Sequence, residues 1–171
     1  MAFLKIVLLS IAASIVYGVA HDQVTARVCV EYFTIGHPPL INSDSPTLLG
    51  LAWGVVATWW VGLPLGLILA VAARVGRLRK FTITQVRPLV VRLLAVMAIA
   101  AFLAGSLGYV LALSGVIWLA GDWADAIPVP VRARFLADLW AHSASYLVGA
   151  FGGVVIARVV YRQRRLEASR T

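Results

Sequence analysis

Charged residues are scarce in this sequence, because Asp, Glu, Lys and Arg together make up only 13% of its 171 residues. Soluble globular proteins average about 25%. Hydrophobic residues make up 61%, and a soluble domain of this length could not bury so much apolar surface. The composition therefore excludes an ordinary soluble domain and predicts an integral membrane protein.

Cysteine is nearly absent as well, since Cys29 is the only one. A single cysteine excludes an intrachain disulfide and a thiolate metal cluster. Cys29 stands between two valines, and a lone cysteine in such surroundings is typical of inert packing rather than of a nucleophile.

Acidic residues are the rarer charge, with seven against 15 Lys and Arg and a formal net charge of +8. The basic residues gather at 74–92 and 158–170, next to apolar runs. A nucleic-acid-binding domain would present such charge on a soluble face, whereas basic residues beside membrane spans are retained on the cytoplasmic side. We therefore expect no nucleic-acid partner and a cytoplasmic position for both clusters.

Long apolar runs are what the sequence has in abundance. About 20 apolar residues cross a bilayer as a helix, and four runs reach that length. They predict an all-α, polytopic membrane protein. Its four transmembrane helices form a bundle with short extracytoplasmic loops, and residues 1–171 make up one integral membrane domain. The predicted spans are residues 3–21, 46–73, 93–120 and 136–158.

Small residues and proline in the second run predict how it packs. The pairs Gly50/Gly54 and Gly62/Gly66 each have the GxxxG spacing that lets a neighbouring helix approach closely. Pro64 in the same run predicts a kink.

The basic clusters also predict the orientation, with both termini in the cytoplasm and residues 21–45 and 121–137 outside. The alternative is that residues 1–20 are a signal peptide, since Gly18 and Ala20 are small residues at the positions that a signal peptidase prefers. Cleavage would make His21 the mature N-terminus and leave three spans. The single Lys5 before a long apolar run favours an uncleaved first helix.

The segment 21–39 reads HDQVTARVCVEYFTIGHPP and is followed by SPTLLGLAWGVVATWW. These strings resemble a group of small, uncharacterised bacterial inner-membrane proteins that share roughly residues 20–60. The resemblance implies a bacterial inner-membrane location for this chain and supplies no activity.

One face of the last predicted helix is polar, because Asp138, His142 and Tyr146 recur at every fourth residue. A stripe of small residues runs beside it and is typical of a seat for a partner helix, so the polar face points into the bundle. Counting outward from Arg158 places Asp138 near the outer boundary and His142 about one turn inside it, and His21 and Asp22 of the first helix reach a similar depth. We expect the two imidazoles to lie within roughly 10 Å of one another, because helices that pack this closely bring side chains of equal depth together.

These residues predict a metal site at the outer face. Imidazoles and carboxylates together suit zinc, iron, copper or manganese, and three protein ligands leave a position open for water or substrate. Asp22, Glu31 and Asp138 are the carboxylates that could contribute. The predicted ligands are His21, His37, Asp138 and His142.

Three alternatives use the same residues. A buried Asp–His hydrogen bond would satisfy both partners without a metal. His21 and His142 could be axial ligands of a haem, although the loops carry no further haem signal. If His21 were the mature N-terminus, its amine and ring could clamp copper together with a second histidine.

Candidate catalytic residues come from the same segment, namely Arg27, Glu31 and Tyr32. If the first helix continues through this segment, Arg27 and Glu31 are four residues apart and well placed for an ion pair. The simpler interpretation of that pair is that it only holds the outer segment together.

Two functions follow from this reasoning. The first is a metal-dependent membrane enzyme or redox protein, in which the metal activates water or a bound lipid headgroup. The second is a non-enzymatic accessory subunit that binds a small polar ligand through the same cluster. A carrier would show a polar path through the bilayer or a repeat of its spans, and the sequence has neither.

Overall fold

The structure is a computed structural model that describes residues 1–169. Four helical segments are long and apolar enough to cross a membrane. They are α1 (Ala2–Val28), the consecutive helices α3 (Pro46–Val56) and α4 (Trp59–Arg74), α5 (Ile83–Leu113), and α7 (Arg132–Ala168) with the preceding 3-10 turn η1 (Val129–Val131). Two short helices, α2 (Glu31–Thr34) and α6 (Asp122–Ala126), lie in the connections. The predicted all-α architecture with four spans is confirmed.

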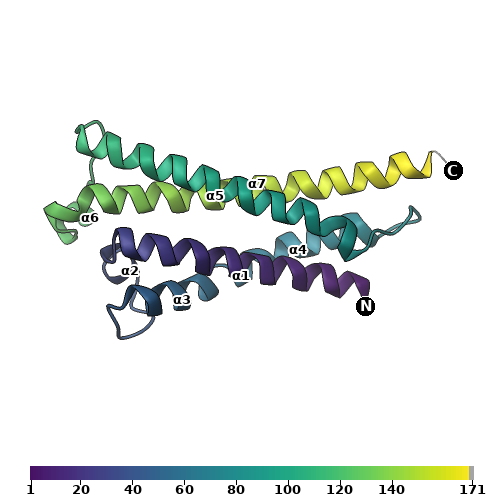
Figure 1. Cartoon of the computed structure of the whole chain (residues 1–171), viewed down its shortest axis with the longest axis horizontal. Helices are drawn as coiled ribbons and strands as arrows, with labels where there is room; N and C mark the ends of the chain where they lie inside the picture. Colours follow the sequence, from purple (N-terminus) through teal and green to yellow (C-terminus); the bar gives the residue numbers. More distant parts are fainter. Residues whose placement is uncertain (170–171) are drawn as a thin grey trace.

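The long helices lie side by side as two pairs, with α1 against α3 and α4 and with α5 along α7 (Figure 1). The N-terminus and the last turn of α7 lie at the same end of the bundle as the connection 75–82, and we call this end the basic end (Figure 1). Helices α2 and α6 lie at the opposite end. Arg170, which belongs to the second basic cluster, lies outside the described residues.

Glycines allow the backbones of α1 and α3 to touch. A Cβ atom added to Gly54 would lie 2.5 Å from the Cα atom of Val19, and one added to Gly18 would lie 2.5 Å from the carbonyl oxygen of Gly54. A Cβ on Gly62 would likewise meet the backbone of α1 at Ile11, 2.9 Å away. The close approach predicted from the GxxxG spacing is confirmed.

The second membrane segment is interrupted between Val56 and Trp59. Thr58 turns its hydroxyl back to the carbonyl oxygen of Gly54, at 2.5 Å, and so competes with the regular helical bond at this point. Pro64 lies inside α4. The sequence predicted a kink at Pro64. The interruption instead lies ahead of the proline, at residues 57–58, and α4 continues through Pro64.

Several predicted span boundaries differ from the helices, and the third span, predicted at residues 93–120, is shifted towards the N-terminus. Helix α5 begins at Ile83, where the backbone N–H of Thr82 donates to Oε1 of Gln85 at 2.8 Å. It ends at Leu113, and Gly115 then takes a φ of 71° that a helix cannot continue. The predicted end at residue 120 is wrong for this reason. Helix α7 has 37 residues, so it is longer than the roughly 30 Å of hydrocarbon in a bilayer.

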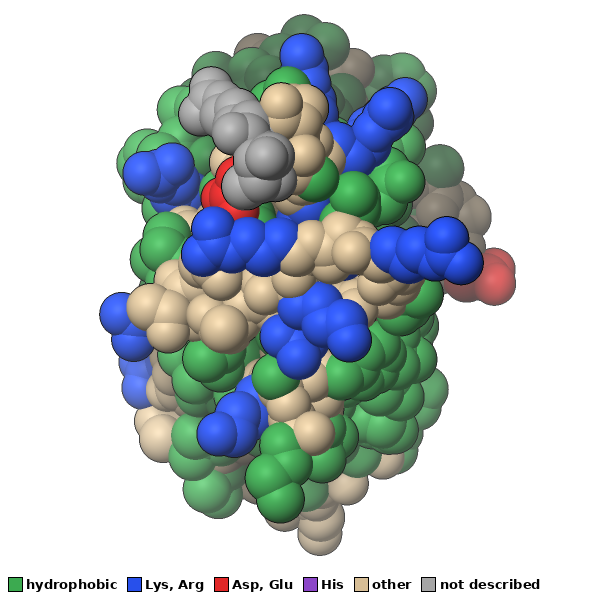
Figure 2. Space-filling view, turned by 90° about the vertical axis from the view of Figure 1, so that its right-hand side faces the viewer, with side chains coloured by type: hydrophobic (Ala, Val, Ile, Leu, Met, Phe, Trp, Pro, Cys, Tyr) green, Lys and Arg blue, Asp and Glu red, His purple; other side chains and the backbone are tan. Residues whose placement is uncertain are grey.

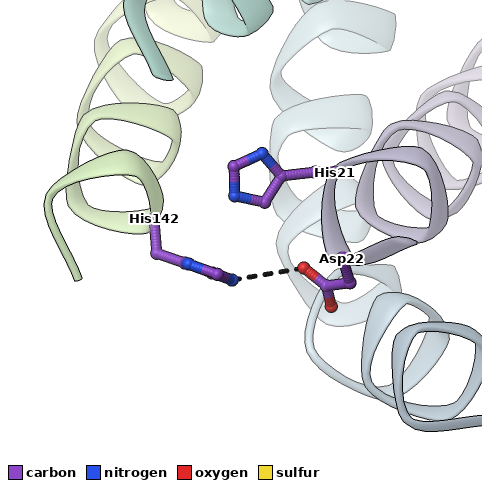
Figure 3. Close-up of side chains that lie close together, drawn as sticks. All are labelled: His21, Asp22 and His142. Carbon is purple, nitrogen blue, oxygen red and sulfur yellow. Dashed lines mark hydrogen bonds and ion pairs between the residues drawn. The ribbon is translucent and has the colours of Figure 1, made fainter. Parts of the chain in front are cut away.

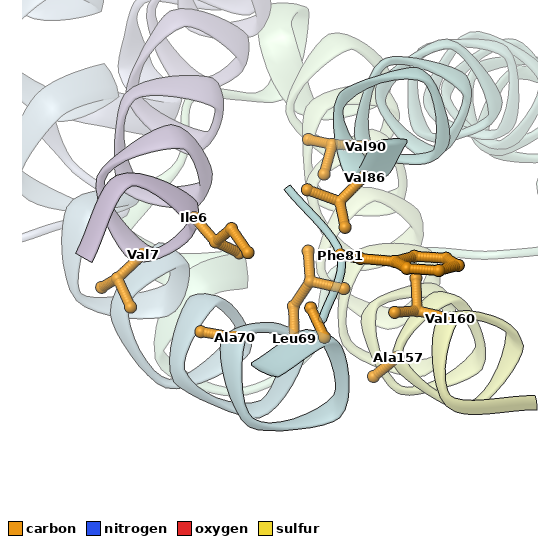
Figure 4. Close-up of a cluster of buried hydrophobic side chains, with 10 residues drawn as sticks. Ile6, Val7, Leu69, Ala70, Phe81, Val86, Val90, Ala157 and Val160 are labelled. Carbon is orange, nitrogen blue, oxygen red and sulfur yellow. The ribbon is translucent and has the colours of Figure 1, made fainter. Parts of the chain in front are cut away.

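At the basic end, apolar side chains from all four membrane segments form one core (Figure 4). Ile6 of α1, Leu69 of α4, Val86 of α5 and Val160 of α7 are all at most 2% exposed. Phe81, in the connection between α4 and α5, packs into the same cluster. This core holds the two helix pairs together at the end remote from the polar residues of the bundle.

Arg164 is fully buried next to this core, at 0% exposure. Its guanidinium donates to four backbone carbonyl oxygens at the end of α4 and in the connection that follows: Ala72 (2.5 Å), Arg79 (2.6 Å), Leu78 (3.0 Å) and Val75 (3.1 Å). One side chain of α7 therefore organises the whole connection between α4 and α5.

Candidate metal centre

Three ionisable side chains converge inside the bundle, near the end opposite the basic one (Figure 3). His21 and Asp22 are consecutive residues of α1, and His142 comes from α7. Each offers a ligand atom, and these atoms all lie within 4.8 Å of one another. We call these residues the triad. The ring centroids of His21 and His142 are 4.5 Å apart, so the predicted approach of the two imidazoles is confirmed.

The hydrogen bonds of His142 fix where its protons are. Its Nδ1 lies 2.8 Å from the carbonyl oxygen of Asp138, and a carbonyl can only accept, so Nδ1 carries a hydrogen. Its Nε2 lies 3.2 Å from Oδ1 of Asp22. A neutral ring would then present a lone pair to a carboxylate, so either a second proton or a cation must lie between them. Metal-bound histidines have this same Nδ1–H to carbonyl contact.

His21 completes the triad with an unsatisfied nitrogen. Its Nε2 is buried and has no hydrogen-bond partner within residues 1–169. Its ring stacks on Tyr17, at a centroid distance of 5.7 Å and an interplanar angle of 15°. A buried nitrogen without a partner costs about 1–3 kcal/mol. The side chain is therefore held in place by ring packing while its ligand atom stays available.

Aromatic side chains of the segment after α1 fix the orientation of the His142 ring. Tyr32 stacks on it at 4.4 Å with an interplanar angle of 24°, and Phe33 meets it edge-on at 5.8 Å. Burial, followed by the nearby carboxylate of Asp138, raises the pKa of Tyr32 above its ordinary value. The raised pKa favours the protonated phenol, and this candidate catalytic residue contacts the triad through its ring.

Two predicted ligands, His37 and Asp138, do not belong to the triad. Nδ1 of His37 lies 2.7 Å from the carbonyl oxygen of Tyr32, and its ring packs on Trp53. Asp138 bonds His142 through its backbone, while its side chain lines a separate groove between α1, α5 and α7. Asp22 supplies the carboxylate instead, because α1 remains helical through Val28 and turns this residue towards α7.

The predicted ion pair between Arg27 and Glu31 is wrong. Helix α1 ends at Val28, and Cys29 is extended, so the two residues do not share a helical face. Arg27 donates to Oε1 of Gln23 at 2.9 Å and to the hydroxyl of Thr47 at 2.8 Å. It therefore joins α1 to the start of α3.

Glu31 is the partner of the buried cysteine. The thiol of Cys29 donates to Oε2 of Glu31 at 3.4 Å. Burial and this hydrogen bond raise the pKa of the Cys29 thiol to about 12. A thiol that stays protonated at neutral pH is not a nucleophile, as expected for a buried lone cysteine. Glu31, the candidate catalytic residue, accepts the hydrogen bond of this thiol and does not belong to the triad.

An internal cavity of about 90 Å³ extends from the triad towards the middle of the bundle. Hydroxyl groups of Tyr17, Ser145 and Tyr146 line it, and the first two share a hydrogen bond of 2.7 Å. This volume holds a few water molecules. Sequence reasoning did not identify either residue as part of the site. Ser145 lies in the small-residue stripe of the last helix, and the only sequence signal for Tyr17 is its position four residues before His21, on the same helix face.

The arrangement offers two imidazoles and a carboxylate to one ion, with room for water beside it. No protein-family model, no curated protein and no solved structure matches this chain.

Proposed function

We propose that this multi-pass membrane protein binds one divalent transition-metal ion through His21, Asp22 and His142. The observation that carries the proposal is the set of unsatisfied lone pairs that face one another. Nε2 of His21 has no partner within the described chain, and Nε2 of His142 faces Oδ1 of Asp22 at 3.2 Å. A cation between these atoms would satisfy all three.

The donor set narrows the choice of ion. Two imidazoles and one carboxylate with open positions suit zinc in hydrolytic sites and ferrous iron in oxygen chemistry. Metal–ligand bonds of about 2.0–2.2 Å hold tetrahedral ligands roughly 3.5 Å apart, whereas the atoms here lie within 4.8 Å. His142 and Asp22, at 3.2 Å, already have about this separation, so binding would mainly draw His21 towards them by about 1 Å. A haem would need its macrocycle between rings whose centroids are only 4.5 Å apart, so the proposal is a single ion.

The chemistry of such an ion is to activate a bound water molecule, by lowering its pKa towards about 7. The 90 Å³ cavity supplies the space for that water, and the hydroxyls of Tyr17 and Ser145 lie along it. Asp22 and the two histidines would hold the ion, and Tyr32 would keep the His142 ring in position. We propose a metal-dependent reaction within the membrane on this basis, with a metal-free hydrogen bond between His142 and Asp22 as the competing outcome.

Metal analysis of the protein purified in detergent tests the proposal. We expect about one equivalent of zinc or iron per chain. His142→Ala and His21→Ala should lower metal affinity by about 100-fold, because each removes a ligand. His37→Ala is the matched control, since it removes a histidine of the same region that lies outside the triad.

Two results would refute the metal proposal. One is a chain that stays metal-free after reconstitution with zinc and, separately, with ferrous iron under anaerobic conditions. The other is equal metal retention in H37A and H142A. Either result would leave these side chains with a structural role, in which His142 and Asp22 form a buried hydrogen bond between α1 and α7.

We propose further that the basic end faces the cytoplasm of a bacterium, with the triad near the outer face of the inner membrane. Figure 2 looks onto the basic end and shows Lys and Arg side chains distributed across it, with few acidic ones. Basic residues beside spans stay on the cytoplasmic side. Alkaline phosphatase fused after residue 171 should be inactive, and the same enzyme inserted at 115–118 should be active. The reverse pattern would overturn the orientation.

A further inference from the structure

A second hollow lies outside the internal cavity, between α1, α5 and α7. It is a groove of about 700 Å³, within the range of about 300–1,000 Å³ that is usual for ligand sites. Its floor is low because α5 and α7 contribute small residues there, and a Cβ atom on Gly105 would lie 3.2 Å from the carbonyl oxygen of Ala137. Val24 and Phe102 on its rim are 63% and 73% exposed. The groove therefore opens sideways, towards the hydrocarbon of the membrane.

A buried polar atom without a partner borders this groove. Asp138 is 2% exposed, and the backbone N–H of Cys29 interacts with its carboxyl group, but its Oδ2 has no hydrogen-bond partner within residues 1–169. An unpaired carboxylate oxygen in an apolar interior costs several kcal/mol. A ligand that donates a hydrogen bond, such as a hydroxyl group, would remove this cost. His21 lines both this groove and the internal cavity, so a ligand here would lie beside the triad.

Two arginines also line the groove, Arg27 from the last turn of α1 and Arg134 from the first turn of α7. Both are exposed, and neither forms an ion pair with any carboxylate of residues 1–169. Arg27 already donates to Gln23 and Thr47, and these bonds leave further N–H groups of its guanidinium for an anion. Arg134 is four residues before Asp138 and so shares its helix face, about 6 Å further along the axis. The groove thus has an apolar body, a buried acceptor and two guanidinium groups.

We propose that this groove binds one anionic glycerophospholipid with a hydroxylated headgroup. The phosphate would lie between Arg27 and Arg134, because guanidinium groups pair with phosphate through two parallel hydrogen bonds. A headgroup hydroxyl would donate to Asp138, and an acyl chain would lie over Ala98 and Ala101. Charge complementarity selects this occupant over a second copy of the chain, whose apolar helices would offer no anion to these two arginines. The lipid site does not depend on a metal at the triad.

Native mass spectrometry of the full chain tests the lipid site, with phosphatidylglycerol and phosphatidylcholine offered in equal amounts. We expect one phosphatidylglycerol to be retained per chain. The double variant R27Q/R134Q should lower its retention by at least about tenfold, because each basic residue contributes roughly fivefold to anionic lipid binding and the two factors multiply. The control R77Q/R87Q, which removes two exposed arginines at the basic end, should retain the lipid as the unchanged protein does.

A second variant keeps the test independent of the arginines. Ala98→Trp fills the groove at an exposed wall position, whereas Ala95→Trp on the same helix lies outside it. A98W should lose the lipid and A95W should keep it. Both double variants should keep their metal, and H142A should keep its lipid, so failure of one site is distinguishable from failure of the other.

Three outcomes would overturn the lipid proposal. These are equal retention of the two lipids, equal retention in R27Q/R134Q and R77Q/R87Q, and a lipid-free dimer in which a second copy protects the groove.

Discussion

Replacing Arg164 with methionine is expected to lower the free energy of unfolding by about 3–5 kcal/mol. Methionine has a similar length and fills the same space but donates no hydrogen bond. Four carbonyl oxygens, from Ala72 to Arg79, would then be buried without their donor. Each unsatisfied acceptor costs about 1–3 kcal/mol, reduced where water can enter.

Thermal unfolding in detergent measures this loss, which corresponds to a fall in Tm of about 10 °C for a chain of this size. The matched control is Arg165→Met, which removes the neighbouring exposed arginine and should leave Tm within about 2 °C. Arg164→Lys should lie between the two, because a single ammonium group cannot reach four carbonyls at once. A Tm of R164M equal to that of R165M would contradict the structural role of Arg164.

Gly54→Ala is expected to cost about 2–3 kcal/mol, although alanine alone favours a helix by about 1 kcal/mol. The added methyl group would lie 2.5 Å from both the Cα and the nitrogen of Val19. Backbone atoms cannot rotate away as a side chain does, so α1 and α3 would have to separate. His21 and Asp22 follow Val19 on α1, and we therefore expect metal affinity to fall together with stability.

Gly152→Ala is the control for this substitution. Its added methyl group would lie 2.2 Å from Cδ1 of Leu93, which is the end of a flexible side chain that can change rotamer. We expect G152A to unfold within about 1 kcal/mol of the unchanged protein. The Tm and the metal content of both variants test this prediction. Equal Tm values for G54A and G152A would show that the close contact between α1 and α3 does not determine stability.

The number of membrane segments and their close packing could be predicted from the sequence, because both depend on local patterns. Apolar runs of sufficient length set the spans, and the spacing of Gly50 and Gly54 set one contact face. The helix ends could not be predicted as well. Leu113 ends α5 because Gly115 adopts a positive φ, and apolar residues continue beyond that point without any change in composition.

The candidate site was predictable in depth but not in rotation about the helix axes. Counting residues from the basic end placed His21 and His142 at one level, and their rings are 4.5 Å apart. Choosing Asp138 over Asp22 relied on the four-residue spacing within α7. The decisive contact is between helices, because it depends on how α1 is turned where it meets α7, and no local pattern encodes that angle.

The bonds of Arg164 also have a consequence in time. Arg79 and Arg164 are 85 residues apart, and a ribosome that adds about 5–20 residues per second needs roughly 4–17 s to cover that interval. During these seconds the carbonyl groups of the connection after α4 have only water to bond. The newly made connection therefore stays in contact with the aqueous phase until α7 has been synthesised. Its basic side chains, including Arg77 and Lys80, favour this position.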